Sequence, residues 1–391
     1  MFKIARPPQS PYRLSDFILH PSFFFLLSLF LASCTTPTLT PPPVTAAFTP
    51  APTLAPGETA LPVAPTPTTV EDPRSGAKGT PTTPTSAPIK IRYVGLSVAP
   101  ETIQRAAQEF GWGFEQTPEA SPDDIRAAAQ SGAQIVIVGG QELQEPARAI
   151  AREFPQVYFI GFGLSGDDLP PNMLNLGGPE SREDQAGFVA GMAAGFATEN
   201  KYVTAISDPS SVEGRKYRNG FLHGVRYACP RCRVEFIDVA DTADAETTST
   251  EAGQYVLFGS DVFFAAAGQA GEAALVTAAN KGAWVIGSGY YDAYSTTFGN
   301  GSIPGSDRVL TSVYVDVGAA VYAALKEYKN GKPLYGAQPF SVASGAIVLA
   351  PIRSPADRLS IPDQADIATA LARLADGSLE TGIDPETGEE K

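Results

Sequence analysis

Between residues 89 and 350, short and continuous apolar runs alternate with segments that have the periodicity of amphipathic helices. The clearest run is Ala133–Val138, with the sequence AQIVIV. Strands without a polar side are typical of parallel sheets that helices cover on both faces. A second series of similar size begins after Asn175. The sequence therefore predicts an α/β fold of two doubly wound parallel-sheet lobes with a hinge.

The alternation also predicts where the elements lie. We expect strands at Ile91–Val98, Ala133–Val138, Val157–Phe162, Tyr202–Ser207, Arg233–Val239, Asp261–Ala266, Ala283–Ser288, Val309–Val313 and Ala346–Leu349. We expect helices at Glu101–Phe110, Asp123–Ser131, Glu142–Phe154, Arg182–Ala197, Glu213–Ala228, Thr247–Phe258, Gly271–Lys281 and Val317–Tyr328. Within a folded part at 89–362, these predict a first lobe over 89–178 plus 290–335 and a second over 179–289 plus 336–362. Residues 363–391 are expected to form a helix and a frayed, acidic tail.

The amino terminus has the layout of an export signal. Lys3, Arg6 and Arg13 precede an uncharged, Phe- and Leu-rich run at 22–31, which is shorter than the roughly 20 residues of a membrane span. The run ends in the tetrapeptide LASC, which resembles a bacterial lipobox and ends at Cys34. We expect a signal peptide over 1–34, lipid attachment at Cys34, and a location on the extracytoplasmic face of the cell membrane. The alternative is a plain signal peptide with a chance cysteine.

Residues 35–88 differ in composition from the rest of the chain. They contain 14 prolines and 15 threonines among 54 positions, and a single aromatic residue, Phe48. Such a segment cannot bury enough apolar surface to offset the entropy that ordering would cost. We therefore expect a disordered tether between the lipid anchor and the folded part.

Charge and composition exclude several classes of function. The formal net charge is −14, whereas binding to nucleic acid needs clustered Lys and Arg, so no nucleic-acid partner is expected. Of the two histidines, His20 lies in the signal, which leaves no multi-histidine metal site. His223 lies on a predicted helix without a recognisable Ser or Cys nucleophile and is interpreted as structural. The sequence thus predicts no catalytic residue, no metal and no cofactor.

Six short stretches, in a fixed order, resemble a known family. EDQAGFVAGMAAGF at 183–196 resembles a helix with the pattern E-x-x-F-L-A-G-x-x-A-G, and KYRNGF at 216–221 resembles R-F-x-x-G-F. AAAGQAG at 265–271, the pair Ile286-Gly287, LTSV at 310–313 and the closing helix at 371–379 follow. Together they are similar to the basic membrane protein family, the PnrA-like lipoproteins that bind substrates for ABC transporters. The resemblance spans about 95–380.

The resemblance implies a type I periplasmic-binding fold that closes on a small ligand and presents it to an ABC permease. Nucleosides are the best-known ligands of the family. The family's Asp-x-x-Phe-Asn segment is absent near Ser97–Pro100, its "IGVD" aspartate falls on Gly289, and its lysine after "TSV" falls on Val315. Because these changes remove much of a nucleoside pocket, a sugar, an amino-acid-like solute and a loss of ligand binding stay open as alternatives.

Neighbouring residues supply the stacking faces and the carboxylate that such a pocket needs. Tyr290, Tyr291 and Asp292 follow a predicted strand, and Phe162 ends another. Gly268 and Gln269 would allow close backbone approach at a strand end. The candidate ligand-binding residues are therefore Phe162, Thr242, Gly268, Gln269, Tyr290, Tyr291 and Asp292.

Two further motifs have structural interpretations. Cys229-Pro-Arg-Cys232 follows a predicted helix, whereas thiol oxidoreductases place this motif at the start of one, so we expect a local disulfide. A thiol oxidoreductase is the alternative. Gly187, Gly191 and Gly195 share one helical face and predict close packing against a neighbouring element.

The fold alone leaves the biological role open. An importer component, a ligand-sensing lipoprotein that signals to a membrane kinase, and a surface lipoprotein with a protein partner share the same architecture. The predicted function is solute binding for an ABC importer.

Overall fold

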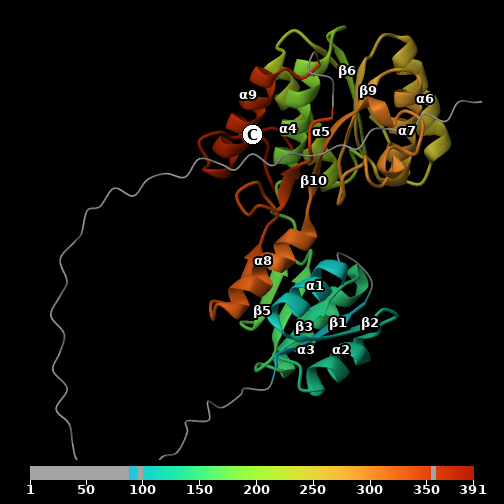
Figure 1. Cartoon of the computed structure of the whole chain (residues 1–391). Helices are drawn as coiled ribbons and strands as arrows, with labels where there is room; N and C mark the ends of the chain where they lie inside the picture. Colours follow the sequence, from blue (N-terminus) through green and yellow to red (C-terminus); the bar gives the residue numbers. More distant parts are fainter. Residues whose placement is uncertain (1–87, 96–99, 354–357) are drawn as a thin grey trace, which may run out of the picture. The chain divides into compact units, whose positions relative to one another are not determined.

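The computed structural model describes residues 88–95, 100–353 and 358–391 (Figure 1). The predicted signal peptide, Cys34 and nearly all of the predicted tether lie outside these residues. The segment at 97–99, where the family's Asp-x-x-Phe-Asn motif would fall, lies outside them as well. Within the described part, no helix combines the length and the apolar character that a bilayer crossing requires.

The first sheet contains six parallel strands in the order β11-β5-β4-β3-β1-β2. Its strands are β1 Lys90–Val94, β2 Gly113–Thr117, β3 Ile135–Val138, β4 Tyr158–Phe162, β5 Met173–Leu176 and β11 Gly336–Gln338. Its helices are α1 Pro100–Phe110, α2 Pro122–Gln130, the 3-10 turn η1 Gln141–Leu143, α3 Gln144–Glu153 and α8 Val317–Lys329. Helices α1 and α8 cover one face, and α2 and α3 cover the other.

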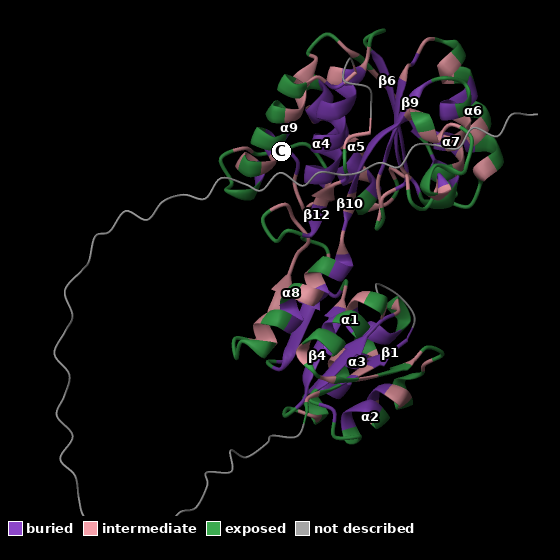
Figure 2. Ribbon diagram, viewed as in Figure 1, coloured by how far each residue is buried: buried purple, intermediate pink, exposed green. Residues whose placement is uncertain are grey.

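The second sheet has the order β12-β10-β9-β8-β6-β7, and only β12 runs antiparallel to its neighbour. Its strands are β6 Tyr202–Ser207, β7 Arg233–Asp238, β8 Val262–Ala266, β9 Trp284–Gly287, β10 Val309–Val315 and β12 Ile347–Leu349. Its helices are α4 Glu183–Ala197, α5 Val212–Ala228, α6 Ala245–Leu257, α7 Gly268–Asn280 and α9 Ile361–Ala375, with 3-10 turns η2 Gly299–Gly301 and η3 Ser306–Arg308. The central strands of both sheets and helix α4 are buried (Figure 2). The predicted α/β fold with two doubly wound lobes is confirmed.

The chain passes from one sheet to the other three times: between β5 and α4, between β10 and α8, and between β11 and β12. The predicted assignment of 290–315 to the first lobe is therefore wrong, because β10 pairs with β9 and β12 in the second sheet. The third crossing follows Gln338 instead of preceding Gly336, because β11 pairs with β5. A buried apolar strand such as β10 could belong to either sheet, so its hydrophobic pattern does not predict in which sheet it lies.

The carboxyl-terminal tail corrects another expectation. Residues 376–391 are folded against α4 and α5 instead of frayed. The Thr381 hydroxyl donates to the buried carboxylate of Asp184, and the ring of His223 hydrogen-bonds to the Thr381 carbonyl oxygen at 2.7 Å. Ile383 is fully buried and forms a bridge with Glu390. The sequence of the tail did not reveal its contacts with Asp184 and His223, because both join residues that are more than 150 positions apart.

Helices α4 and α5 pack with their backbones in contact. A Cβ atom on Gly191 would lie 2.2 Å from the carbonyl oxygen of Phe221, and one on Gly224 would lie 1.9 Å from that of Phe188. No carbon atom can approach an oxygen so closely without displacing it. The close packing predicted from the glycine spacing is confirmed, and glycines of both helices contribute to it.

The predicted disulfide joins Cys229 and Cys232, whose Cα atoms are 5.4 Å apart. Cys229 caps the carboxyl end of α5, and β7 begins directly after Cys232. The helix dipole at this end does not stabilise a thiolate. The position fits a structural staple of the turn.

Candidate functional site

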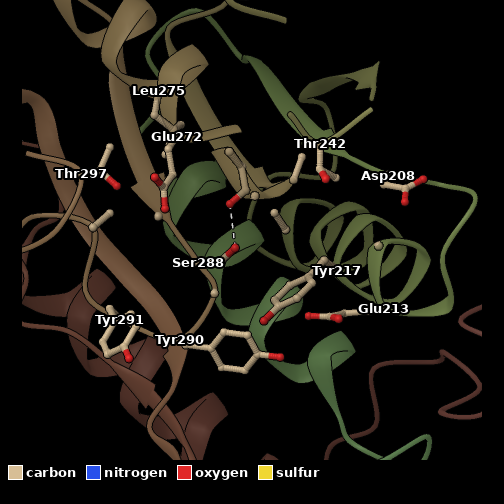
Figure 3. A pocket seen from close by; sticks show the side chains of 18 of the residues that line it. Asp208, Glu213, Tyr217, Thr242, Glu272, Leu275, Ser288, Tyr290, Tyr291 and Thr297 are labelled. Atoms are coloured by element: carbon tan, nitrogen blue, oxygen red, sulfur yellow. Dashed lines mark hydrogen bonds between the residues drawn. The ribbon is translucent and has the colours of Figure 1, made fainter. Parts of the chain in front are cut away.

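A cavity of about 430 Å³ lies at the carboxyl edge of the second sheet (Figure 3). Its walls come from the segments that follow β6, β7, β8 and β9. Ligands of open α/β sheets bind beyond this end of the strands. The polar side chains that line it are Asp208, Ser211, Glu213, Thr242, Glu272, Ser288, Thr296 and Thr297, and the aromatic ones are Tyr217, Tyr290 and Tyr291.

Backbone turns hold the cavity wall in place. Gly268 begins α7 with a φ of +52°, and the Cβ of Thr242 lies 3.4 Å from where a Gly268 Cβ would be. The Ala270 N–H donates to the Thr242 carbonyl oxygen at 2.8 Å. The Ser288 hydroxyl donates to the Ala265 carbonyl oxygen at 2.7 Å, which ties the loop after β9 to the end of β8 (Figure 3).

Three tyrosines and one glutamate define one side of the cavity. Tyr217 is 2% exposed, whereas Tyr290 and Tyr291 are 50% and 55% exposed. The carboxylate of Glu213 lies beside the hydroxyl groups of Tyr217 and Tyr290 (Figure 3). Burial, with the charges of Glu213 and Glu183, raises the pKa of Tyr290 to about 12. Burial also raises the pKa of Tyr217, so the phenols of Tyr217 and Tyr290 remain protonated at physiological pH.

Glu213 shares its surroundings with a buried ion pair. The Nζ of Lys216 donates to the Glu183 carboxylate at 3.1 Å and to the carbonyl oxygens of Pro179 and Ser181 at 2.6 and 2.7 Å. The Glu213 side chain is exposed where it lines the cavity. Partial desolvation, followed by repulsion from Glu183, raises the pKa of Glu213 in spite of Lys216. The ammonium group of Lys216 thus acts on two carboxylates, those of Glu183 and Glu213.

The other two carboxylates of the cavity, Asp208 and Glu272, differ in their partners. The Ser210 hydroxyl and its N–H (2.8 Å) donate to Asp208, and these bonds, the hydroxyl first, lower the pKa of Asp208. Glu272 and Glu213 form no ion pair within the described part of the chain. No described Lys, Arg or His lines the cavity. Its electrostatics therefore disfavour anionic ligands.

Residues 94–349 match the family described as ABC transporter substrate-binding protein PnrA-like. The chain belongs to this family. The family is one of substrate-binding proteins, not of enzymes, and the match spans the whole cavity.

Individual relatives of the PnrA-like protein agree with the family match. This chain is 24% identical to the ABC transporter nucleoside-binding protein BmpA of Lactococcus lactis subsp. cremoris, and the match covers 57% of this chain and 65% of BmpA. It is 23% identical to basic membrane protein C of Borreliella burgdorferi, over 63% and 66%. The chain thus spans just under two thirds of each relative. An ABC transporter solute-binding protein from Conexibacter woesei has the same fold, with a TM-score of 0.62, 21% identity and coverage of 75% and 98%.

The structure brings four of the predicted ligand-binding residues of the PnrA-like protein to the cavity: Thr242, Gly268, Tyr290 and Tyr291. Gln269 lies next to Gly268 but does not line it. Phe162 ends β4 in the first sheet, where its N–H donates to Gln144 Oε1 at 2.7 Å.

Asp292 is held outside the cavity lining. It forms an ion pair with Arg353 at 2.6 Å and accepts a hydrogen bond from Ser312 at 2.9 Å. The carboxylate thereby anchors the loop that carries Tyr290 and Tyr291. Its contacts are those of a positioning residue.

Sequence reasoning missed the carboxylates Asp208, Glu213 and Glu272 and did not assign Tyr217 to the site. Asp208 directly follows β6, so the rule that ligands bind beyond strand ends would have found it. Glu213 and Tyr217 lie on the first turns of α5, where an acidic residue is equally expected to stabilise a helix terminus. Glu272 lies on α7, and no sequence motif pointed to its place in the site.

Ser207 directly precedes Asp208, which lines the cavity. It ends β6, is fully buried, and its hydroxyl has no hydrogen-bond partner among the described residues. An unsatisfied buried polar group costs about 1–3 kcal/mol, so we expect Ser207→Ala to raise the free energy of unfolding by about 1 kcal/mol. Urea denaturation would measure the change. A loss of stability would mean that the hydroxyl has a partner in solution.

Proposed function

We propose that this PnrA-like protein is the lipid-anchored, extracytoplasmic solute-binding component of an ABC importer. The family match and the cavity at the carboxyl edge of the second sheet support the proposal. The LASC sequence at Cys34 supports anchoring. In this mechanism the solute binds to the second lobe, and the first lobe adds contacts that exist only when the two lobes close. Those contacts shift the equilibrium towards the closed form, which an ABC permease would recognise.

Nucleosides are the first solutes to test. One relative is named a nucleoside-binding protein. In the cavity, Tyr290 and Tyr291 offer aromatic surface for a base, and Glu213 and Asp208 offer acceptors for sugar hydroxyl groups. A few convergent polar groups on a largely apolar wall are typical of small-molecule sites. Sugars and amino-acid-like solutes belong in the same screen.

The single observation that carries the proposal is a cavity lined by polar and aromatic groups in a chain of this family. Native mass spectrometry of the purified protein would reveal a co-purified solute. A thermal-shift screen of nucleosides, sugars and amino acids would follow. A ligand present at 100 times its Kd stabilises the folded state by about 2.7 kcal/mol, which such a screen detects.

Tyr290→Ala is expected to abolish or strongly weaken the thermal shift produced by the solute. Tyr335→Ala is the matched control, because Tyr335 is 49% exposed and does not line the cavity, whereas Tyr290 is 50% exposed and does. Isothermal titration calorimetry of both variants would measure the affinities. Equal affinities would refute the cavity as the binding site.

A further inference from the structure

The cavity of the PnrA-like protein has more negative than positive charge. Asp208, Glu213 and Glu272 line it, and no described basic side chain does. The nearest ammonium group belongs to Lys216, which is 2% exposed and already donates to Glu183 and to two carbonyl oxygens. Glu213 and Glu272 are exposed in the cavity, and neither forms an ion pair among the described residues. A ligand with a positive charge would be attracted to these carboxylates.

Oxygen atoms converge on one side of the cavity. The Glu213 carboxylate and the hydroxyl groups of Tyr217 and Tyr290 lie next to one another (Figure 3). Neither phenol has a hydrogen bond to Glu213 within the described part. An ammonium group carries three N–H donors, which matches one carboxylate and two phenol oxygens in number and in chemical type. The aromatic rings also attract a cation through their negative faces.

We propose that the natural solute carries a protonated amine, and that the Glu213 carboxylate and the Tyr217 and Tyr290 hydroxyl oxygens bind this ammonium group. The inference rests on the proposed function, because it takes the cavity to be the solute site. It narrows the solute to small amines, such as amino sugars or aminonucleosides. It excludes phosphorylated solutes, which the three carboxylates would repel.

The surroundings of Glu213 determine how binding depends on pH. Glu183 on α4, Lys216 and Tyr217 on α5, and Tyr290 in the loop after β9 are the titratable groups around it. Because the pKa of Glu213 is raised, the carboxylate becomes protonated at a higher pH than an ordinary glutamate. The affinity for an amine should therefore fall as the pH is lowered through that range. The affinity for a neutral solute should not.

The test uses pairs of compounds that differ by an ammonium group in place of a hydroxyl group. Suitable pairs are 5′-amino-5′-deoxyadenosine with adenosine, and glucosamine with glucose. Calorimetry at pH 7.5 would give the Kd of each compound for the intact protein, for Glu213→Gln and for Glu272→Gln. The second variant is the matched control, since it removes the same charge from another part of the cavity. Thermal unfolding would establish that both variants are folded.

We expect the amine to bind at least tenfold more tightly than its neutral counterpart in any pair that binds. Glu213→Gln should abolish this preference, and Glu272→Gln should retain it. Equal affinity within a pair, or a preference that survives Glu213→Gln, would overturn the inference and leave the proposed function standing. If no compound binds and no solute co-purifies, the proposed function and the inference both fail.

Discussion

Gly224→Ala is expected to lower the free energy of unfolding of the PnrA-like protein by about 3 kcal/mol, the upper part of the range for overpacked cores. The new Cβ would lie 1.9 Å from the carbonyl oxygen of Phe188. This oxygen belongs to the backbone of α4, so the two helices must separate to accommodate the methyl group. Chemical denaturation monitored by circular dichroism would measure the loss.

Gly253→Ala in α6 is the control for this substitution. There the nearest atom to the new Cβ is the Cε of Lys281, 2.9 Å away at the flexible end of a side chain. This side chain can move, and alanine favours a helix over glycine by about 1 kcal/mol. The control should therefore be neutral or slightly stabilising. Equal losses in both variants would contradict the explanation by backbone contact.

Lys216→Met is expected to destabilise the protein by about 3–5 kcal/mol at pH 7.5, because it leaves a buried carboxylate without its partner. Methionine preserves most of the side-chain volume and removes only the charge and the donors. The carboxylate of Glu183 and the carbonyl oxygens of Pro179 and Ser181 then lose a hydrogen bond each. Lys332→Met, at an exposed position, should change stability by less than about 0.5 kcal/mol.

The pH dependence gives this prediction a second readout. Burial already raises the pKa of Glu183 above 4.5 in the folded protein, and Lys216 opposes the rise. A raised carboxyl pKa stabilises the folded state fully below pH 4.5, and the contribution is lost as the pH rises through the folded value. Without Lys216 the folded pKa is higher still. The difference between Lys216→Met and wild type should therefore be smaller at pH 5 than at pH 7.5, and an unchanged difference would contradict the charge explanation.

The central strands were predictable because burial on both faces of a sheet requires a continuous run of apolar or small residues. Every residue of β3 and β6 is buried, and both carry continuous apolar or small residues. The edge strand β2 reads GFEQT and none of it is fully buried, while β11 has only three residues. Such strands carry no periodic signal, because their pairing depends on neighbours from distant parts of the chain.

The candidate site was predictable in location and only partly in composition. Tyr290 and Tyr291 follow a strand, and the general rule for strand ends brings them to the cavity. Asp292 follows the same strand, but its carboxylate pairs with Arg353, 61 residues later. A short sequence pattern cannot reveal which of three adjacent side chains a distant arginine will engage. The position of Glu213 at a helix start had a structural explanation, which concealed its exposure to the cavity.

The three crossings between the sheets have a consequence for the order of folding. The first lobe needs α8 and β11, which the chain supplies only after the whole second sheet up to β10. The hydrogen bond between Glu109 and Tyr322 spans 213 positions. Contacts of such high sequence separation form slowly. Neither lobe exists as one continuous stretch, so residues 90–176 alone should not fold as an isolated fragment. A fusion of 317–338 to 90–176 would place all strands and helices of the first lobe in one continuous chain.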